Sequence, residues 1–447
     1  MKRQLFSANA SCALRFTTAR LALIASLLVG IQVLAPSPAQ AQQRHMAGEI
    51  LVRYAPGVSK GEIAEMNRLH RVRILEVIPE LGIYRVSIPG NATVGAMITE
   101  LSLDPRFEDA EPNYIGKGGD FLPNDPSFPK QWHLHNTGQF GGTADADIDA
   151  VEGWQITRGD ESIIVAVLDT GINFDHPDFV GRILPGFDFV NEDSDPTSDN
   201  PHGVWVSGVL AANADNSLSV AGVDHFAQIL PVKILNDEGF GSSFDLAQGL
   251  IFAANEGADV INMSLIGFGG SDVESALQFA RDSGAVLIAC AGNGGIGDAD
   301  RNALSVSPLT ISVGATTESD ERASFSGTGS ALDVVAPGSF IWTTNDRSRG
   351  PTWFSGCSAA TPIVSGITSL LLSLAPFLTD DEVRGILAQT AEDRVGSPSE
   401  DTLGRDDFFG HGRVNMNQAL TLIVECAANS RSHRAFRRCV SRHARPS

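Results

Sequence analysis

Short apolar runs that alternate with helical patterns constrain the fold of this chain most strongly. From residue 161 onward, runs typical of buried strands are separated by longer segments with helical periodicity. The apolar runs cover residues 163–168, 229–235, 260–265, 286–291 and 311–313, and the helical patterns cover residues 202–212, 244–255, 273–281, 358–374, 380–390 and 415–424. Strands joined through helices run parallel, so we expect an α/β fold with a parallel sheet covered by helices on both faces. In such sheets functional groups gather at the carboxyl ends of the strands.

The preceding segment, residues 48–117, has the pattern of a separate small domain. Strand-like and helix-like pieces alternate in the order βαββαβ over residues 49–54, 60–69, 74–88, 93–103 and 107–114, with a hairpin at residues 80–82. This order predicts a small α+β domain of the ferredoxin-like kind. Turn-forming residues at 118–126 mark its end. A fold of this kind does not by itself identify a function.

The first 41 residues have the pattern of a secretory signal. Basic residues precede an apolar run at 21–34, and the small residues Ala39 and Ala41 flank Gln40 where cleavage is expected. The alternative is an uncleaved membrane anchor, but this run is shorter than the roughly 20 residues that span a bilayer. We therefore expect a secreted protein, extracellular or periplasmic, with no membrane span in its mature form.

The charge of the chain excludes one class of partner. The formal net charge is −21, and residues 119–424 carry 42 Asp and Glu against 13 Lys and Arg. Nucleic acid is a polyanion, so we expect no nucleic-acid partner for this region.

Three polar residues stand where the predicted strands and helices end or begin. Asp169 follows an apolar strand, His202 opens a helix, and Ser358 lies among small residues at the head of a long apolar helix. Taken singly, each has an ordinary structural explanation as a turn or helix cap. Together they are the parts of a catalytic triad, in which the serine attacks, the histidine takes its proton and the aspartate fixes the histidine tautomer.

The motifs around these residues, at 167–178, 202–208 and 356–362, resemble those of the subtilisin-like serine peptidases, the subtilases. The resemblance extends over about residues 124–422 and implies a serine endopeptidase that cleaves polypeptides. It also makes residues 42–118 resemble the inhibitory prosegment of the family. We therefore expect a signal peptide at 1–41, a prosegment at 42–118 that acts as an intramolecular inhibitor, a catalytic domain at 119–424 and a basic, Cys-containing tail at 425–447.

The resemblance assigns further site residues. Asn293 matches the residue that stabilises the oxyanion, and Gly292 lines the primary pocket. Two backbone stretches pair with an extended substrate, and they consist of Gly239, Phe240, Gly241, Ser264, Leu265 and Ile266.

The sequence also departs from the family pattern. The residues that differ beside the triad are Pro201, Val204, Trp205 and Cys357, which stands where Thr is usual. Ile266 occupies a position that is normally Gly, so its side chain is expected to narrow the primary pocket. These departures bear on specificity more than on catalysis.

A structural calcium ion is the cofactor that the resemblance implies. Its predicted ligands come from one carboxylate and the loop after the histidine helix, and they are Asp178, Asn213, Asn216, Leu218 and Val220. A second acidic stretch, Asp145 to Asp149, resembles a calcium loop, but Ala150 replaces the glycine that such a loop needs, so caps and turns are expected there. His176 lacks further ligands at zinc spacing.

The five cysteines fall into three groups. Cys12 lies in the predicted signal, Cys290 and Cys357 lie in the catalytic core, and Cys426 and Cys439 flank the basic tail. We interpret the core cysteines as buried thiols, with a nucleophilic Cys357 as the alternative. The tail pair could close a small loop in an oxidising compartment. The Arg-rich tail itself is expected either to bind acidic surfaces, including the catalytic domain, or to be a disordered soluble end.

Two other functions are compatible with parts of this pattern. A catalytically silent module on the same fold would bind peptides or adhere without cutting, but the chain keeps all four catalytic groups. A serine esterase of the α/β-hydrolase type would need a second glycine after Ser358 and a different chain order of the triad. Protein hydrolysis that a serine-directed fluorophosphonate blocks distinguishes the peptidase from both alternatives.

Overall fold

The protein forms two compact units, Met1–Gly118 and Gly119–Ser447, which are described separately. The structure is a computed structural model that describes residues 45–443, except residues 80, 91, 115–120, 198–199, 346–349 and 431. The predicted signal peptide at 1–41 lies outside the described residues.

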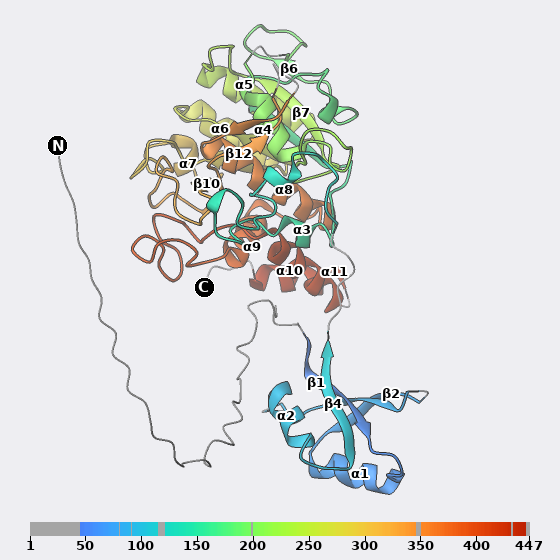
Figure 1. The fold of residues 1–447 in the computed structure, drawn as a ribbon. Coiled ribbons are helices and arrows are strands. Elements are labelled where there is room, and N and C mark those ends of the chain that lie inside the picture. Colours follow the sequence, from blue (N-terminus) through green and yellow to red (C-terminus); the bar gives the residue numbers. More distant parts are fainter. Residues whose placement is uncertain are drawn as a thin grey trace, which may run out of the picture. The chain divides into compact units, whose positions relative to one another are not determined.

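The N-terminal unit is a four-stranded antiparallel sheet with two helices, blue to cyan in Figure 1. Its elements are β1 (His45–Tyr54), α1 (Lys60–Leu69), β2 (Arg73–Ile78), β3 (Ile83–Ser87), α2 (Val94–Leu101) and β4 (Phe107–Tyr114). The strand order in the sheet is β2-β3-β1-β4, and every neighbouring pair is antiparallel. The predicted βαββαβ order is confirmed.

Helix caps and a single core stabilise the N-terminal unit. Ser59 and Glu62 form a capping box at the start of α1, and the side chain of Thr93 caps α2. Met66 of α1 packs into the core with Ile50 of β1. Both helices thus cover the sheet with their apolar sides.

The second unit, which we call the catalytic unit after the domain predicted there, is built around a seven-stranded parallel sheet. The strand order is β11-β10-β9-β8-β5-β7-β6. Its strands are β5 (Ile164–Asp169), β6 (Phe187–Asp188), β7 (Gln228–Lys233), β8 (Val260–Met263), β9 (Val286–Cys290), β10 (Ile311–Thr316) and β11 (Val334–Pro337). The strands follow the apolar runs of the sequence closely, because a strand buried on both faces needs apolar residues at nearly every position.

Helices cover both faces of this sheet. Val165 and Val167 of β5 pack in one core with α4 (His202–Ala211) and α8 (Cys357–Leu374). Ala166 and Leu168 point to the other face, into a core with α5 (Ser243–Asn255) and α6 (Ser271–Asp282). The predicted fold class is confirmed.

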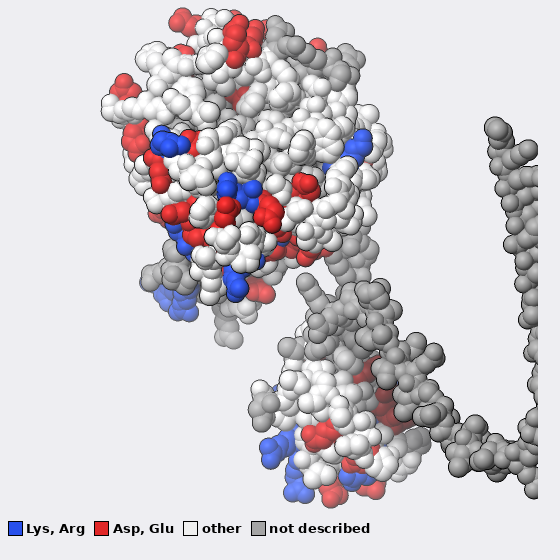
Figure 2. All heavy atoms as spheres, turned by 60° about the vertical axis from the view of Figure 1, so that its left-hand side comes forward, with Lys and Arg blue, Asp and Glu red and all other residues white. Residues whose placement is uncertain are grey.

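Smaller elements complete the unit and shape its surface. They are α3 (Ala150–Gly153), α7 (Ala303–Val306), the short turns η1 (Phe128–Lys130), η2 (Gln139–Gly141) and η3 (Pro177–Phe179), and the hairpin of β12 (Ile341–Thr343) and β13 (Thr352–Phe354). Figure 2 shows acidic side chains spread over one face of this unit, with isolated basic side chains between them.

The C-terminal residues pack on the catalytic unit as helices. They form α9 (Asp380–Thr390), α10 (Met416–Ala428) and α11 (His433–His443), so the boundary expected at 424/425 falls inside α10. Val440 is buried, and Arg437 lies 3.7 Å from the carboxylate of Glu382. Cys426 and Cys439 are joined as a disulfide between α10 and α11. The described part of the tail is therefore helical and contacts an acidic group of the catalytic unit.

Among the described residues, only α8 is long and apolar enough to cross a membrane by length and composition, and 89% of that stretch is buried inside the unit. Burial of this kind is expected for the core helix of a globular unit.

Candidate active site

Asp169 lies at the carboxyl end of β5, where the strand passes into a glycine turn. Its side chain is completely buried, and the backbone N–H of Thr170 donates to Oδ1 over 2.7 Å. The Thr170 hydroxyl accepts from the N–H of Gly203 (2.9 Å), which fixes the start of α4 against the end of β5. A side chain at Gly203 would meet the Gly171 carbonyl at 2.1 Å, so this close approach requires glycine.

His202 opens α4 and points its imidazole at Asp169. Its Nδ1 lies 2.8 Å from Oδ1 and 3.0 Å from Oδ2 of Asp169. A hydrogen bond from Nδ1 to a carboxylate leaves Nε2 as the free basic nitrogen. The structure therefore brings together the first two predicted members of the triad.

Apolar rings surround the other side of His202. The Phe354 ring meets the imidazole edge-on with centroids 5.4 Å apart, and the Trp205 ring packs against Phe354 at 5.3 Å. Burial lowers the pKa of His202, but the charge of Asp169 and the hydrogen bond to it outweigh burial and hold the pKa above the ordinary value of 6.5. Trp205, a departure from the family pattern, thus helps to form the wall behind the His202 imidazole.

Ser358 is the second residue of α8. It is buried, and its hydroxyl donates to the backbone carbonyl of Ser264 over 3.2 Å. In return the Ser264 hydroxyl donates to the Ser358 carbonyl over 3.1 Å. The structure records no hydrogen bond between Ser358 and His202, although catalytic hydrogen bonds often tighten only when substrate is bound. The partial positive charge of the α8 N-terminus favours a negative charge beside Ser358.

Asn293 follows β9 and lies beside the start of α8. Its side-chain Oδ1 accepts a hydrogen bond from the Cys357 N–H over 2.9 Å. The preceding Gly292 has a φ of +117°, and a side chain there would collide with Asp298. The glycine therefore allows the turn that carries Asn293 to the head of α8.

The predicted substrate-binding residues follow three strands at the same edge of the sheet. Gly239–Gly241 come after β7, residues 264–266 after β8 and Gly292 after β9. Phe240 is 74% exposed and Ile266 is 53% exposed, whereas Leu265 is buried. The side chains of Phe240 and Ile266 are thus available to a ligand at this edge.

The predicted calcium ligands show a pattern that the sequence did not reveal. Asp178 Oδ2 and Asp125 Oδ1 are buried, and neither has a hydrogen-bond partner. Burial raises the pKa of Asp125 to about 6, and the nearby charge of Asp178 adds to the effect. Asn216 Nδ2 donates to the other oxygen of Asp178 over 3.0 Å. Asp125 was missed in the sequence, where its only signal was a place in a turn-rich junction.

The other predicted loop ligands differ in their contacts. The loop bends sharply, with positive φ at Asp215, Ser217 and Ser219. Asn213 Oδ1 accepts from the Arg182 guanidinium over 3.2 Å, while Leu218 is exposed and Val220 is buried. Among the described residues, no group of three or more His, Cys, Asp or Glu side chains could hold a metal ion by itself.

The acidic stretch near residue 147 has a structural role. Asp147 accepts hydrogen bonds from the backbone N–H groups of Asn136 and Asp149, each over 2.6 Å, and the Asp149 carboxylate accepts one from the Asn415 side-chain amide over 2.8 Å. These carboxylates cap turns and connect segments of the unit.

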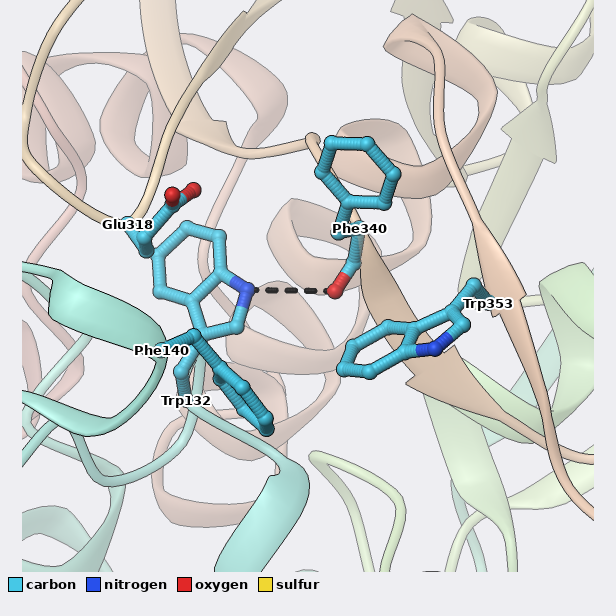
Figure 3. Close-up of a pocket in the computed structure, with 5 residues that line it drawn as sticks. All are labelled: Trp132, Phe140, Glu318, Phe340 and Trp353. Atoms are coloured by element: carbon cyan, nitrogen blue, oxygen red, sulfur yellow. Dashed lines mark hydrogen bonds between the residues drawn. The ribbon is translucent and has the colours of Figure 1, made fainter. Parts of the chain in front are cut away.

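An aromatic pocket of about 270 Å³ lies behind the hairpin that carries Phe354. Figure 3 shows its lining residues, which are Trp132, Phe140, Glu318, Phe340 and Trp353. The Trp132 indole N–H donates to the Phe340 carbonyl over 3.2 Å. Consecutive strand residues point to opposite faces, so Trp353 faces this pocket while Phe354 faces His202. No motif in the sequence indicated this pocket.

The two core cysteines were interpreted from the sequence as buried thiols, and the structure corrects this. Cys290 and Cys357 are joined as a disulfide, with Cα atoms 5.2 Å apart. Cys357 therefore has no free thiol to act as a nucleophile. The pairing could not be read from two positions 67 residues apart.

The chain matches known families and proteins over most of its length. The Subtilase family pattern matches residues 160–412, and the pattern of the fervidolysin N-terminal prodomain matches residues 32–113. A thermophilic serine proteinase of Bacillus sp. strain AK1 is 33% identical over 387 residues, which cover 84% of this chain and 88% of the relative. Thermitase of Thermoactinomyces vulgaris is 36% identical over 301 residues, which cover 67% and 99%.

Solved structures show the same likeness. A protease of Pseudoalteromonas arctica has a TM-score of 0.60 and 28% identity, and covers 67% of this chain and 99% of its own. Fervidolysin of Fervidobacterium pennivorans, described as a keratinolytic enzyme, has a TM-score of 0.57 and 23% identity, over 84% of this chain and 61% of its own. At that identity the second likeness concerns the fold.

Proposed function

The chain belongs to the subtilase family and is a serine endopeptidase with an N-terminal prodomain, and on that premise we propose that Asp169, His202 and Ser358 form its catalytic triad. The contact of 2.8 Å between His202 Nδ1 and Asp169 Oδ1 is the observation that carries this proposal. The enzyme cleaves polypeptides, and it is secreted.

In the proposed mechanism, substrate binding moves the Ser358 hydroxyl from the Ser264 carbonyl to His202 Nε2. The oxygen attacks the scissile carbonyl while the imidazole takes the proton, and Asp169 stabilises the imidazolium. The negative oxygen of the tetrahedral intermediate accepts from the Asn293 side-chain amide and from the Ser358 backbone N–H. His202 then returns the proton to the leaving amine, and water hydrolyses the acyl-enzyme by the same route.

We propose that an extended polypeptide lies between the backbone stretches 239–241 and 264–266. Backbone N–H and C=O groups of an extended chain recur regularly, which suits pairing with two exposed segments. Gly292 lines the pocket for the side chain before the scissile bond. The exposed Ile266 side chain narrows that pocket and selects against large side chains.

The N-terminal unit is proposed to inhibit the catalytic unit until it is removed. The support is its match to the fervidolysin N-terminal prodomain and the turn-rich residues that follow it. In this proposal the signal at 1–41 is removed on secretion, and the catalytic unit cuts its own chain between about residues 118 and 124. The oxidising compartment then keeps Cys426 and Cys439 paired.

We propose that the second unit binds a structural calcium ion. Two buried carboxylate oxygens without partners, from Asp125 and Asp178, suit a hard cation that takes oxygen ligands. We propose that these two residues hold the ion together with oxygens of Asn216, Leu218 and Val220. Asn213 Oδ1 accepts from the positively charged Arg182 guanidinium, so Asn213 is left out of this set, whereas Asn216 Oδ1 accepts from the neutral Leu218 N–H over 2.8 Å. When bound, the ion neutralises the two carboxylates and stabilises the loop.

Casein hydrolysis by the purified mature protein tests the proposed function. We expect hydrolysis that a fluorophosphonate abolishes by modifying Ser358, and none from a Ser358→Ala variant. Binding of casein without hydrolysis would instead support the catalytically silent module, and turnover of esters alone would support an esterase.

A further inference from the structure

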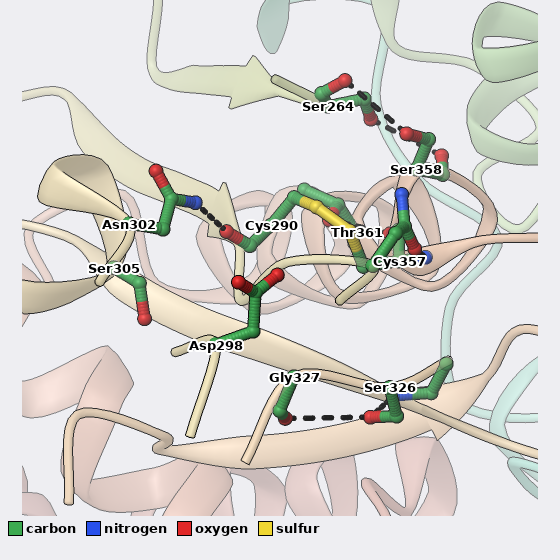
Figure 4. The surroundings of a disulfide bond; sticks show 12 residues. Ser264, Cys290, Asp298, Asn302, Ser305, Ser326, Gly327, Cys357, Ser358 and Thr361 are labelled. Atoms are coloured by element: carbon green, nitrogen blue, oxygen red, sulfur yellow. Dashed lines mark hydrogen bonds between the residues drawn. A yellow bond between two sulfur atoms is a disulfide. The ribbon is translucent and has the colours of Figure 1, made fainter. Parts of the chain in front are cut away.

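The disulfide between Cys290 and Cys357 connects two catalytic segments. Cys290 is the last residue of β9, and Cys357 is the first residue of α8 (Figure 4). Both side chains are completely buried. Because the sulfur atoms are buried and bonded to each other, the bond is a candidate for positioning rather than for chemistry.

Each cysteine is close in sequence to a residue with a proposed role at the tetrahedral intermediate. Ser358 directly follows Cys357, and Asn293 lies three residues after Cys290. The two segments also meet through one hydrogen bond, because the Cys357 N–H donates to Asn293 Oδ1 over 2.9 Å. A covalent bond and a hydrogen bond therefore join the oxyanion segment to the nucleophile segment.

The hydrogen bond sets the direction of the Asn293 amide. An amide side chain has an oxygen that accepts and an NH₂ group that donates. With Oδ1 held by the Cys357 N–H, the NH₂ group is left to donate to the oxyanion. A shift of β9 relative to α8 would lengthen this hydrogen bond and turn the donor away.

The backbone on each side of the disulfide is also fixed. Asn302 Nδ2 donates to the Cys290 carbonyl over 2.7 Å, and the Thr361 hydroxyl donates to the Cys357 carbonyl over 2.7 Å (Figure 4). The Ala291 N–H donates to the Val313 carbonyl over 2.9 Å, which extends the pairing of β9 with β10 beyond Cys290. The disulfide thus joins two rigid segments, and rigid support is what a preorganised oxyanion hole requires.

We propose that Cys290 and Cys357 are positioning residues for peptide hydrolysis, and that their disulfide holds the Asn293 donor in register with Ser358. This inference rests on the proposed function, because it needs Asn293 to donate to the oxyanion. It predicts an effect on transition-state stabilisation that is separate from any effect on folding.

The test compares the two disulfides of the described chain. A Cys290→Ala, Cys357→Ala variant is compared with wild type and with a Cys426→Ala, Cys439→Ala control. All three proteins are assayed at a temperature below the start of their thermal unfolding, and their active sites are counted by fluorophosphonate titration. With a peptide anilide substrate, we expect kcat to fall about 10-fold in the first variant with KM unchanged, because only an interaction of the transition state is weakened. The control variant should keep the kcat of wild type.

A double-mutant cycle separates positioning from general stability. If the disulfide acts through Asn293, removing it in an Asn293→Ala background should lower kcat less than about twofold, since the donor is already absent. An equal loss of kcat in both backgrounds would overturn the proposal. So would an unchanged kcat in the first variant, or free thiols at both positions in mass spectrometry of the non-reduced wild-type protein.

Two provisions keep the test decisive. If the double alanine variant does not fold, Cys290→Ala alone breaks the same bond with a smaller loss of buried volume, and the same outcomes apply. If wild type does not hydrolyse the substrate, it is the proposed function that fails. If wild type is active but the effects in the cycle are additive, only the positioning role is contradicted and the proposed function stands.

Discussion

The N-terminal unit and the catalytic unit bury their apolar side chains in different ways. In the N-terminal unit two helices and one sheet share a single core, and the edge strand β2 leaves Ile74, Leu75 and Ile78 substantially exposed. In the catalytic unit the strands are buried on both faces between two cores. Small units bury a smaller fraction of their surface and are correspondingly less stable.

Disulfides and ion pairs increase the difference in stability between the two units. Both disulfides of the described chain lie in the catalytic unit. There the buried guanidinium of Arg413 also pairs with Asp320 over 2.7 Å and with Glu392. Local unfolding exposes a chain to proteolysis, so a unit that opens rarely survives among proteases. We therefore expect the N-terminal unit to unfold and be degraded more readily than the catalytic unit.

Asp169→Asn tests the role of the Asp169 carboxylate in the catalytic unit. We expect kcat to fall about 10⁴-fold, as in other serine proteases, because the histidine loses its correct tautomer. In wild type the acid limb of kcat/KM should lie above pH 6.5, since the His202 pKa is raised and only neutral imidazole acts as base. Without the carboxylate, burial is the main remaining influence on His202 and lowers its pKa. The acid limb of the variant should therefore move to lower pH.

Steady-state kinetics between pH 4 and pH 10 on the mature protein measure both effects. The exposed Asp175→Asn is the matched control and should behave as wild type. If the acid limb of kcat/KM in Asp169→Asn lay at the same pH as in wild type, the role given to this carboxylate would be contradicted.

Asn293→Ala tests the second catalytic segment. Loss of one oxyanion donor is expected to lower kcat about 10²–10³-fold, a magnitude known from a subtilisin, with little change in KM. Removal of the prosegment should become slow without stopping. Kinetics with a peptide anilide measure this, with the exposed Asn429→Ala as control. A KM that rises while kcat stays constant would place Asn293 in ground-state binding instead.

Calcium removal should distinguish the two units by stability. An ion that binds only the folded catalytic unit stabilises it by about 4 kcal/mol at a concentration 1,000 times its Kd. In the full chain with Ser358→Ala, a chelator should therefore lower the unfolding midpoint of the catalytic unit and leave that of the N-terminal unit in place. Scanning calorimetry measures both midpoints.

Asp178→Asn should abolish the response to calcium, while the exposed Asp145→Asn should preserve it. Equal stability in excess chelator and in millimolar calcium would rule out the proposed ion.

The tail disulfide should have the smallest effect. Its 13-residue separation limits the entropic stabilisation to about 3 kcal/mol or less. Cys426→Ala with Cys439→Ala should lower the unfolding midpoint of the catalytic unit slightly and leave kcat unchanged. Free thiols at both positions in the non-reduced secreted protein would show that the tail is held by packing alone.

Much of this molecule follows from local patterns in the sequence. Asp169, His202 and Ser358 could be found because each lies at the end of a strongly patterned strand or helix. The βαββαβ order was equally clear, since its apolar periods change from strand to helix and back. In both cases each motif or apolar period is contained in a short stretch of the chain.

The missed features depend on distant parts of the chain. Asp125 comes under the charge of Asp178 only in the folded unit, and Cys290 meets Cys357 only when β9 and the start of α8 are in register. Helix α11 was obscured by its arginines, although Phe436 and Val440 lie four residues apart on one side of it. Such meetings are set by tertiary packing, which a local pattern does not encode.

The most direct test of the account is the chain length of a Ser358→Ala protein made in a protease-deficient host. The variant removes one hydroxyl, which donates to the Ser264 carbonyl and does not cap α8, so folding should lose only about 1 kcal/mol. If the catalytic unit removes its own prosegment, mass spectrometry should find a single chain that begins near Gln42, whereas wild type begins between about residues 118 and 124. A Ser358→Ala protein cut at the same junction as wild type would contradict self-maturation, because another protease would then have made the cut.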